Sequence, residues 1–283
     1  MSEPQTLLLG FIAGVTILAG LPLGRVRAPR PGTRQFLSAL AIGILLFLVW
    51  DVLAHAWEPL DTALGRLHEG TAGTGPVVGY SILFFAGLAA GLMSLVYYER
   101  WLAVRGRPRG FGPGAVAPGE LAAGRAGIAN WSAARRMSLL IAVGIGLHNF
   151  GEGLAIGGSA ATGAIGLATI LVIGFALHNG TEGFGIVAPL AAEGDRPSWR
   201  FLLLMGLIGG GPTTVGTAVG RQFSSAAMSV VFLTLAAGSI LYVVIQLLGV
   251  AHKSARKDLM YWGILLGLAA GFVTDMVVTA GGA

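Results

Sequence analysis

Two copies of a polar motif, thirty residues apart, interrupt strongly apolar stretches of this sequence. They read His-Asn-Phe-Gly-Glu-Gly at 148–153 and His-Asn-Gly-Thr-Glu-Gly at 178–183. In each copy a glutamate follows a histidine by four residues, which gives two pairs: His148 with Glu152, and His178 with Glu182. Residues four apart project from one face of a helix, so each copy predicts an imidazole beside a carboxylate. Such a pair is typical of divalent metal ligands.

The motif helices are expected to face each other. If the turn between them centres near residue 165, His148 lies opposite Glu182, and Glu152 lies opposite His178. Two nitrogens and two carboxylates suit zinc and other late first-row ions better than calcium. The arrangement is also a local two-fold repeat around a polar site, which is characteristic of secondary transporters.

Two asparagines extend the expected ligand set. Asn149 and Asn179 follow the histidines and offer amide oxygens on an adjoining helix face. The flanking glycines weaken the local helix, as in the discontinuous helices of transporters. The alternative is a pair of structural His–Glu contacts that lock the helices together. We favour metal binding because ionisable residues inside membranes are usually functional, and these recur in register.

The composition indicates the environment of these motifs. Of 283 residues, 54% are hydrophobic and only 11% are charged, which predicts a polytopic membrane protein and excludes a soluble nucleic-acid-binding module. The chain contains no cysteine, so disulfides and thiolate metal sites are excluded.

We expect a single all-α transmembrane domain over residues 1–283. Its helices are predicted from apolar stretches of roughly the length that a ~30 Å hydrocarbon core requires. There are eight such stretches: 6–24, 36–57, 77–98, 137–158, 164–189, 201–220, 226–249 and 260–280. The segment 99–136 is rich in Gly, Pro, Ala and Arg, and is predicted to be a mobile cytoplasmic linker.

The basic residues predict the orientation. With both termini outside, the inner loops contain 16 of the 18 Lys and Arg residues, and only Arg66 and Arg221 lie outside. Cytoplasmic loops carry such an excess of positive charge. We therefore predict a multi-pass protein of the cell (inner) membrane with both termini outside.

A second polar set is predicted near the outer surface. Asp51 and His55 lie four residues apart near the outer end of the second span, and Asp275 lies in the outer third of the last span. Negative charge at an outer mouth raises the local cation concentration, so these residues are candidates for the path by which metal enters. For His55, an interfacial histidine that caps a helix is the alternative.

The doubled motif resembles the His-Asn-x-Pro-Glu-Gly signatures in the fourth and fifth helices of the ZIP family of divalent metal transporters, most closely its bacterial GufA-like branch. The resemblance covers eight spans, outer termini and a long loop after the third span. It implies a homodimer, a metal site between the fourth and fifth helices, and an elevator-like motion that carries metal inward.

The sequence also departs from this pattern. Gly151 and Thr181 replace the two family prolines, so kinks there would depend on glycine. Gly211 stands before Pro212 where many members carry a metal-binding Glu, which predicts a single metal site. Gln246 replaces an inner Glu of some members, and is a candidate for the exit path or for a structural hydrogen bond.

The predicted function is divalent cation transport into the cytoplasm. Zn²⁺ is the leading substrate, and Fe²⁺, Mn²⁺, Cd²⁺ and Co²⁺ tolerate the same ligands. No resident cofactor, enzymatic activity or nucleic-acid partner is expected. The alternatives are an intramembrane metalloenzyme, which would usually show a His-Glu-x-x-His motif, and a static metal sensor.

Overall fold

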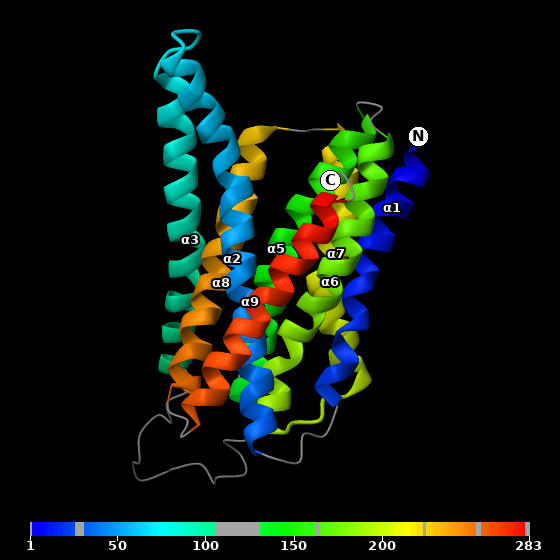
Figure 1. Ribbon diagram of the computed structural model, residues 1–283, viewed down its shortest axis with the longest axis vertical. Helices are drawn as coiled ribbons and strands as arrows, with labels where there is room; N and C mark the ends of the chain where they lie inside the picture. Colours follow the sequence, from blue (N-terminus) through cyan, green and yellow to red (C-terminus); the bar gives the residue numbers. More distant parts are fainter. Residues whose placement is uncertain are drawn as a thin grey trace, which may run out of the picture.

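The computed structural model describes residues 2–25, 31–105, 131–161, 165–222, 225–252 and 256–280. The described residues are helical apart from short turns, and the helices run side by side in one bundle (Figure 1). The elements are α1 (Glu3–Val15), η1 (Thr16–Ala19), η2 (Leu21–Arg25), α2 (Pro31–His68), α3 (Gly75–Arg105), α5 (Ala133–Ala161), α6 (Ile165–Glu193), α7 (Trp199–Gln222), α8 (Ala226–Ala251) and α9 (Lys257–Ala280).

The bundle has the dimensions of a membrane domain. Among the described residues, seven helical segments are long and apolar enough to cross a bilayer, and the first of them joins α1, η1 and η2. Helix α6 adds a further 29-residue helix, part of whose side chains lie outside the described set. The prediction of an all-helical polytopic membrane protein is therefore confirmed.

Two helices are much longer than the sequence indicated. Helix α2 has 38 residues, and at 1.5 Å per residue it is about 57 Å long, well above a ~30 Å hydrocarbon core. Together with α3 it projects beyond the other helices at one end of the bundle (Figure 1). The start of α1 and the end of α9 lie toward the same end of the bundle (Figure 1).

The expected linker at 99–136 is shorter than predicted. Helix α3 continues to Arg105 and α5 begins at Ala133, so both edges of this segment are helical. Residues 106–130, on which the prediction of a mobile linker mainly rests, lie outside the described residues.

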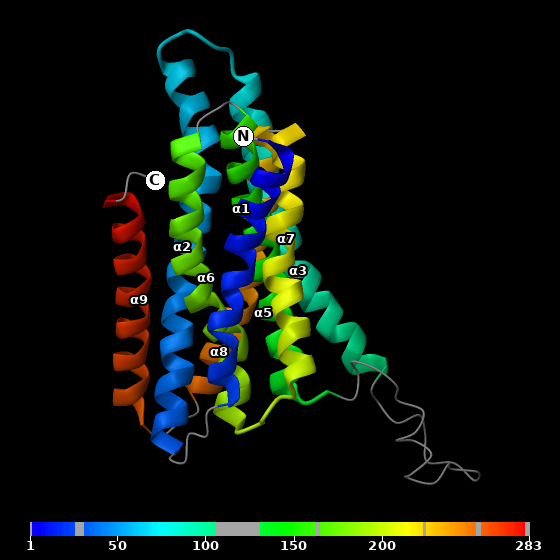
Figure 2. The same ribbon diagram turned by 90° about the vertical axis from the view of Figure 1, so that its right-hand side faces the viewer.

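The helices form two groups. Helices α1, α5, α6 and α7 pack on one another, and so do α2, α3, α8 and α9. Figure 1 shows α1, α6 and α7 on one side and α3 and α8 on the other, and Figure 2 shows α9 lying along α2. The groups meet where α5 contacts α8 and where α6 contacts α2 and α9.

Within each group, glycines bring helix backbones into direct contact. A methyl group on Gly153 of α5 would overlap the carbonyl oxygen of Thr213 in α7, and one on Gly216 would overlap that of Phe150. Small residues at helix interfaces permit this close approach in membranes. The second group has the same kind of contact at two pairs: Gly238 with Leu88, and Gly267 with Leu40.

Between the groups the contacts are made by side chains. A methyl group on Gly144 of α5 would lie 3.3 Å from side-chain atoms of Ser239 and Ile240, and one on Gly151 would lie 2.9 Å from a Leu233 methyl. Buried branched side chains fill the space here, among them Leu45, Leu48, Ile141, Ile145 and Val243. The two groups thus touch through an apolar layer of side chains.

Candidate functional site

The polar centre of the bundle lies between α5 and α6. The Nε2 atom of His148 is 3.3 Å from Oε1 of Glu152, one turn further along α5, and 3.7 Å from Oε1 of Glu182 on α6. His148 and Glu152 are 4% and 5% exposed, and Glu182 is fully buried. The contact of His148 with Glu182 agrees with the register expected from the doubled motif.

His178 completes the predicted set, one turn before Glu182 on α6. Its backbone belongs to the described helix, but its side chain lies outside the described residues. Among the side chains that are described, no three His, Asp or Glu residues form a group ready to hold a metal ion.

The motif helices are not broken. Helices α5 and α6 each run for 29 residues through their motifs, although the glycines led us to expect local weakening. The discontinuity lies instead in the first span, where α1 passes into the 3-10 turn η1 at Thr16. The motif glycines Gly153 and Gly183 serve close packing, against the backbones of Thr213 and Ile17.

The two asparagines extend from the polar centre, where Asn149 interacts with the Glu182 carboxylate, to helices outside the motif pair. Asn149 Nδ2 donates to the carbonyl of Gly209 in α7 at 3.0 Å, and Asn179 Nδ2 donates to the carbonyl of Ala13 in α1 at 2.8 Å. Both side chains are fully buried. Their Oδ1 atoms have no hydrogen-bond partner within the described part of the chain. The amides therefore anchor the motif helices to neighbours that the sequence did not identify.

The predicted outer residues lie in the other helix group. Asp51 of α2 is 7% exposed and lies within electrostatic range of His148 and of Asp275 on α9. His55 is largely exposed, and its Nδ1 lies 2.9 Å from the Asp51 carbonyl oxygen and 3.4 Å from the Asp51 carboxylate. Asp51 thus lies closest to the buried centre, and His55 lies on its solvent side.

Gln246 forms a hydrogen bond within its own helix. Its Nε2 donates to the Tyr242 hydroxyl at 3.1 Å, which matches the structural alternative considered from the sequence. Gly144 faces Ile240 and Gly151 faces Leu233 in the antiparallel α5–α8 pair. The same register sets Ser138 level with Gln246.

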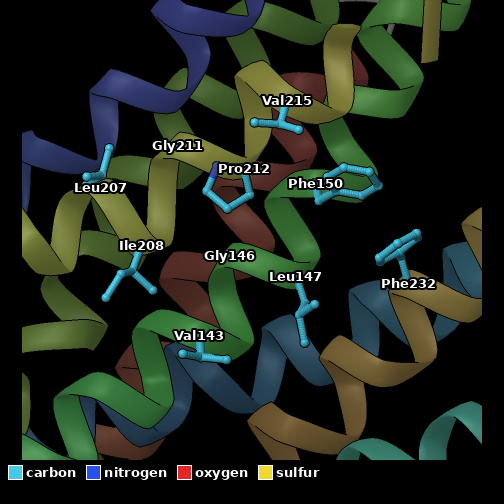
Figure 3. Close-up of a pocket in the computed structure, with 10 residues that line it drawn as sticks. All are labelled: Val143, Gly146, Leu147, Phe150, Leu207, Ile208, Gly211, Pro212, Val215 and Phe232. Carbon is cyan, nitrogen blue, oxygen red and sulfur yellow. The ribbon is translucent and has the colours of Figure 1, made fainter. Parts of the chain in front are cut away.

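Gly211 does not face the polar centre. It lines an apolar groove of about 590 Å³ between α5, α7 and α8, together with Pro212, Leu147 and Phe150 (Figure 3). Of the described residues, only Leu207 lies within 4 Å of a methyl group added at 211. A carboxylate introduced at 211 would therefore enter this groove rather than the polar centre.

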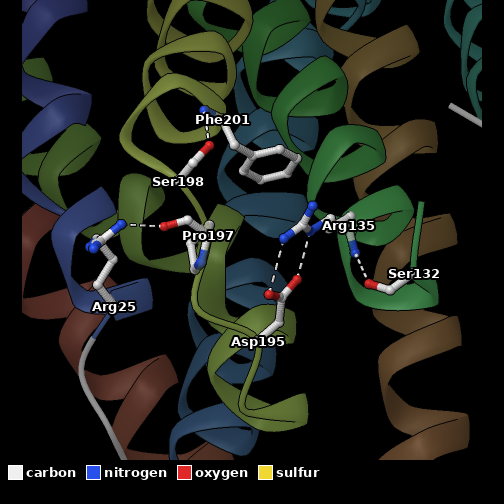
Figure 4. A network of polar contacts seen from close by, with 7 residues as sticks. All are labelled: Arg25, Ser132, Arg135, Asp195, Pro197, Ser198 and Phe201. Carbon is white, nitrogen blue, oxygen red and sulfur yellow. Dashed lines mark hydrogen bonds and ion pairs between the residues drawn. The ribbon is translucent and has the colours of Figure 1, made fainter. Parts of the chain in front are cut away.

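A polar network that the sequence did not reveal ties the helix ends together (Figure 4). Arg135 of α5 forms a two-pronged ion pair with Asp195, with Nε–Oδ2 and Nη2–Oδ1 distances of 2.7 and 3.1 Å. Arg25 donates to the Pro197 carbonyl, and its guanidinium lies over the Trp199 ring. The linker predicted from the sequence included Arg135, yet this residue fixes the start of α5 to the α6–α7 turn.

The fold and this centre define a class of protein: a polytopic helical membrane protein with a buried histidine–carboxylate cluster between two antiparallel helices. The profile of the ZIP zinc transporter family matches residues 120–274, more than half of the chain, and includes both motifs. The chain belongs to the ZIP zinc transporter family, as its motifs predicted. No curated protein matches it, and its assignment to the GufA-like branch stays a prediction.

Proposed function

We propose that this ZIP family member carries a divalent metal ion, Zn²⁺ in the first place, into the cytoplasm through a site between α5 and α6. Family membership alone makes it a divalent metal transporter of a multi-pass membrane type, and the members of this family are transporters rather than enzymes. The proposal adds the site, the direction and the motion. Its primary ligands are His148, Glu152, His178 and Glu182.

One observation carries the site. His148 approaches carboxylates from two helices within 3.3 and 3.7 Å, and all three groups are buried. Two carboxylates buried in a membrane repel each other unless a cation lies near both. Ligand nitrogen and oxygen atoms lie ~2.0–2.2 Å from a bound zinc ion. Small side-chain shifts would allow all three groups to reach one ion at this distance. Asn149 and Asn179 directly follow the two histidines, and their amide oxygens would add weaker neutral ligands.

The two helix groups support an elevator-like motion. The proposed ligands belong to α5 and α6, in a group whose helices are held together by backbone contacts at glycines. The facing group presents mainly side chains across the boundary. A layer of apolar side chains can slide more readily than interlocked backbones, so the ligand-bearing group would move as a unit past α2 and α8.

A polar path on either side of the centre fits this motion. Asp51, with His55 and Asp275 around it, would attract the ion from outside. On the inner side Gln246 and Tyr242 form a polar pair, and Ser138 has a buried hydroxyl without a hydrogen-bond partner among the described residues. These side chains would pass the ion to the cytoplasm.

The proposal also covers the orientation of the protein in the membrane and its oligomeric state. The charge distribution supports an inner-membrane protein with outer termini, in which the α2–α3 hairpin would lie outside and the α6–α7 turn inside. Family resemblance favours a homodimer. Besides Zn²⁺, the proposed substrates are the divalent ions of iron, manganese, cadmium and cobalt.

The test is metal flux into proteoliposomes. Glu152→Ala, Glu182→Ala and His178→Ala should each reduce zinc uptake to the background of empty liposomes, while Glu69→Ala, in the exposed α2–α3 turn, should retain it. Normal uptake by both Glu152→Ala and Glu182→Ala would refute the site. Binding of zinc without uptake by the unaltered protein would favour a static sensor, and the same assay with the other ions ranks the substrates.

A further inference from the structure

Each asparagine of the doubled motif hydrogen-bonds to a helix outside the α5–α6 pair. Asn149 reaches the carbonyl of Gly209 in α7, and Asn179 reaches the carbonyl of Ala13 in α1. These bonds, of 3.0 and 2.8 Å, are made by fully buried side chains. They join helices that are distant in sequence, by 60 residues in one case and 166 in the other.

The next turn of each helix pair repeats the contact in the same register. Four residues after Asn149, Gly153 lies against the carbonyl of Thr213, which is four residues after Gly209. Four residues after Asn179, Gly183 lies against the carbonyl of Ile17, which is four residues after Ala13. The pair α5–α7 and the pair α6–α1 are thus built alike.

Both acceptors lie beside an irregular point in their helix. Gly209 lies three residues before Pro212, whose missing N–H removes the helical donor of the neighbouring Ile208 carbonyl. Ala13 lies just before α1 passes into η1, and its carbonyl also accepts from the Thr16 hydroxyl at 2.5 Å. A carbonyl oxygen has two lone pairs, so it can accept the asparagine in addition to a bond within its own helix.

We propose that Asn149 and Asn179 are a matched pair of positioning residues that clamp α5 onto α7 and α6 onto α1. Neighbouring residues on a helix point about 100° apart, so fixing the asparagine also fixes the direction of the histidine before it. The clamp therefore sets the rotation of each motif helix, and with it the approach of His148 to Glu182. The purpose of this positioning, to hold metal ligands, rests on the proposed function. The clamping of α5 onto α7 and of α6 onto α1 does not depend on it.

A clamp and a metal ligand differ in the metal-free protein. A clamp stabilises the chain whether or not metal is bound, whereas a ligand contributes only when metal is present. Interhelical hydrogen bonds in membranes have modest strength, so the loss of one should be measurable without unfolding the chain.

The test is thermal unfolding of the full chain in detergent after treatment with a chelator. Asn149→Ala and Asn179→Ala should each lower the metal-free midpoint by about 2–4 °C. Ser239→Ala is the matched control, because among the described residues this buried hydroxyl donates to the Leu235 carbonyl of its own helix, and its midpoint should stay within about 1 °C. Leucine variants keep a similar side-chain volume and lose the N–H₂ group without adding a charge, so they should lower the metal-free midpoint as alanine does.

An unchanged metal-free midpoint in both alanine variants, with loss only of the stabilisation caused by added zinc, would overturn the clamp. If the alanine variants do not accumulate, the leucine variants decide: accumulation with an unchanged metal-free midpoint overturns the clamp, and a lowered midpoint supports it. Because these midpoints are measured without transport, a failure of flux in liposomes would count against the proposed function alone.

Discussion

A comparison of two motif glycines tests the packing that holds the site. Gly153→Ala and Gly180→Ala make the same chemical change in helices α5 and α6, and both glycines belong to the doubled motif. The structure predicts opposite results. A methyl group on Gly153 would overlap the Thr213 carbonyl and lie 2.8 Å from the backbone nitrogen of Thr217, whereas one on Gly180 would meet no atom of the described residues within 4 Å.

The expected magnitudes follow from two opposing effects. Alanine stabilises a helix interior by about 1 kcal/mol relative to glycine. Overpacking costs about 1–3 kcal/mol, and the upper half of that range applies at Gly153 because backbone atoms of α7 cannot rotate away. Gly153→Ala should therefore lose about 1–2 kcal/mol net, whereas Gly180→Ala should gain up to about 1 kcal/mol.

The assay is the unfolding midpoint of the metal-free protein, followed by zinc flux. At about 2–4 °C per kcal/mol, Gly153→Ala should unfold about 2–8 °C lower and Gly180→Ala up to about 4 °C higher than the unaltered chain. Flux should fall in Gly153→Ala, since a displaced α5 moves Glu152, and should stay within about twofold in Gly180→Ala. Equal midpoints for the two variants would show that the backbones of α5 and α7 are not in direct contact at Gly153.

Three further outcomes are expected. Asp195→Asn should lower the unfolding midpoint by about 1–4 °C, because the ion pair with Arg135 is only partly buried and contributes about 1 kcal/mol at most; an unchanged midpoint would remove this pair from the forces that hold α5. Gly211→Glu should not raise the amount of zinc bound per chain, since its carboxylate enters an apolar groove, and it should lower accumulation in the membrane; doubled zinc binding would contradict this placement. In this naturally cysteine-free chain, Gly73→Cys should react with an impermeant maleimide in intact cells and Arg196→Cys only after permeabilisation; the reverse pattern would invert the proposed topology.

Local periodicity accounts for what could be predicted from the sequence. The four-residue spacing of His and Glu depends only on the helical repeat, and the thirty-residue spacing of the motifs gave the expected register of His148 with Glu182. The apolar stretches predicted membrane helices because a bilayer requires their length. The family, too, was identifiable from these motifs.

Contacts between distant helices could not be predicted in this way. Asn149 and Asn179 were predicted as ligands because they follow the histidines, and nothing in the motifs indicated that their amides also donate to α7 and α1. Gly153 and Gly180 are the same residue type in the same doubled motif, and the nearby α7 backbone at Thr213 and Thr217 makes a methyl group costly at Gly153.

The extent and direction of elements were also decided by the tertiary structure. Nothing in the apolar pattern marks the end of α2 at His68, because a helix that leaves the bilayer no longer needs apolar residues. Arg135 looked like one of many loop arginines until the α6–α7 turn brought Asp195 beside it. Gly211 occupies a ligand position in the family pattern, but the rotation of α7 turns it toward the groove. The sequence by itself determined which groups are costly to bury in a membrane, whereas helix rotation and packing determined which partners those groups meet.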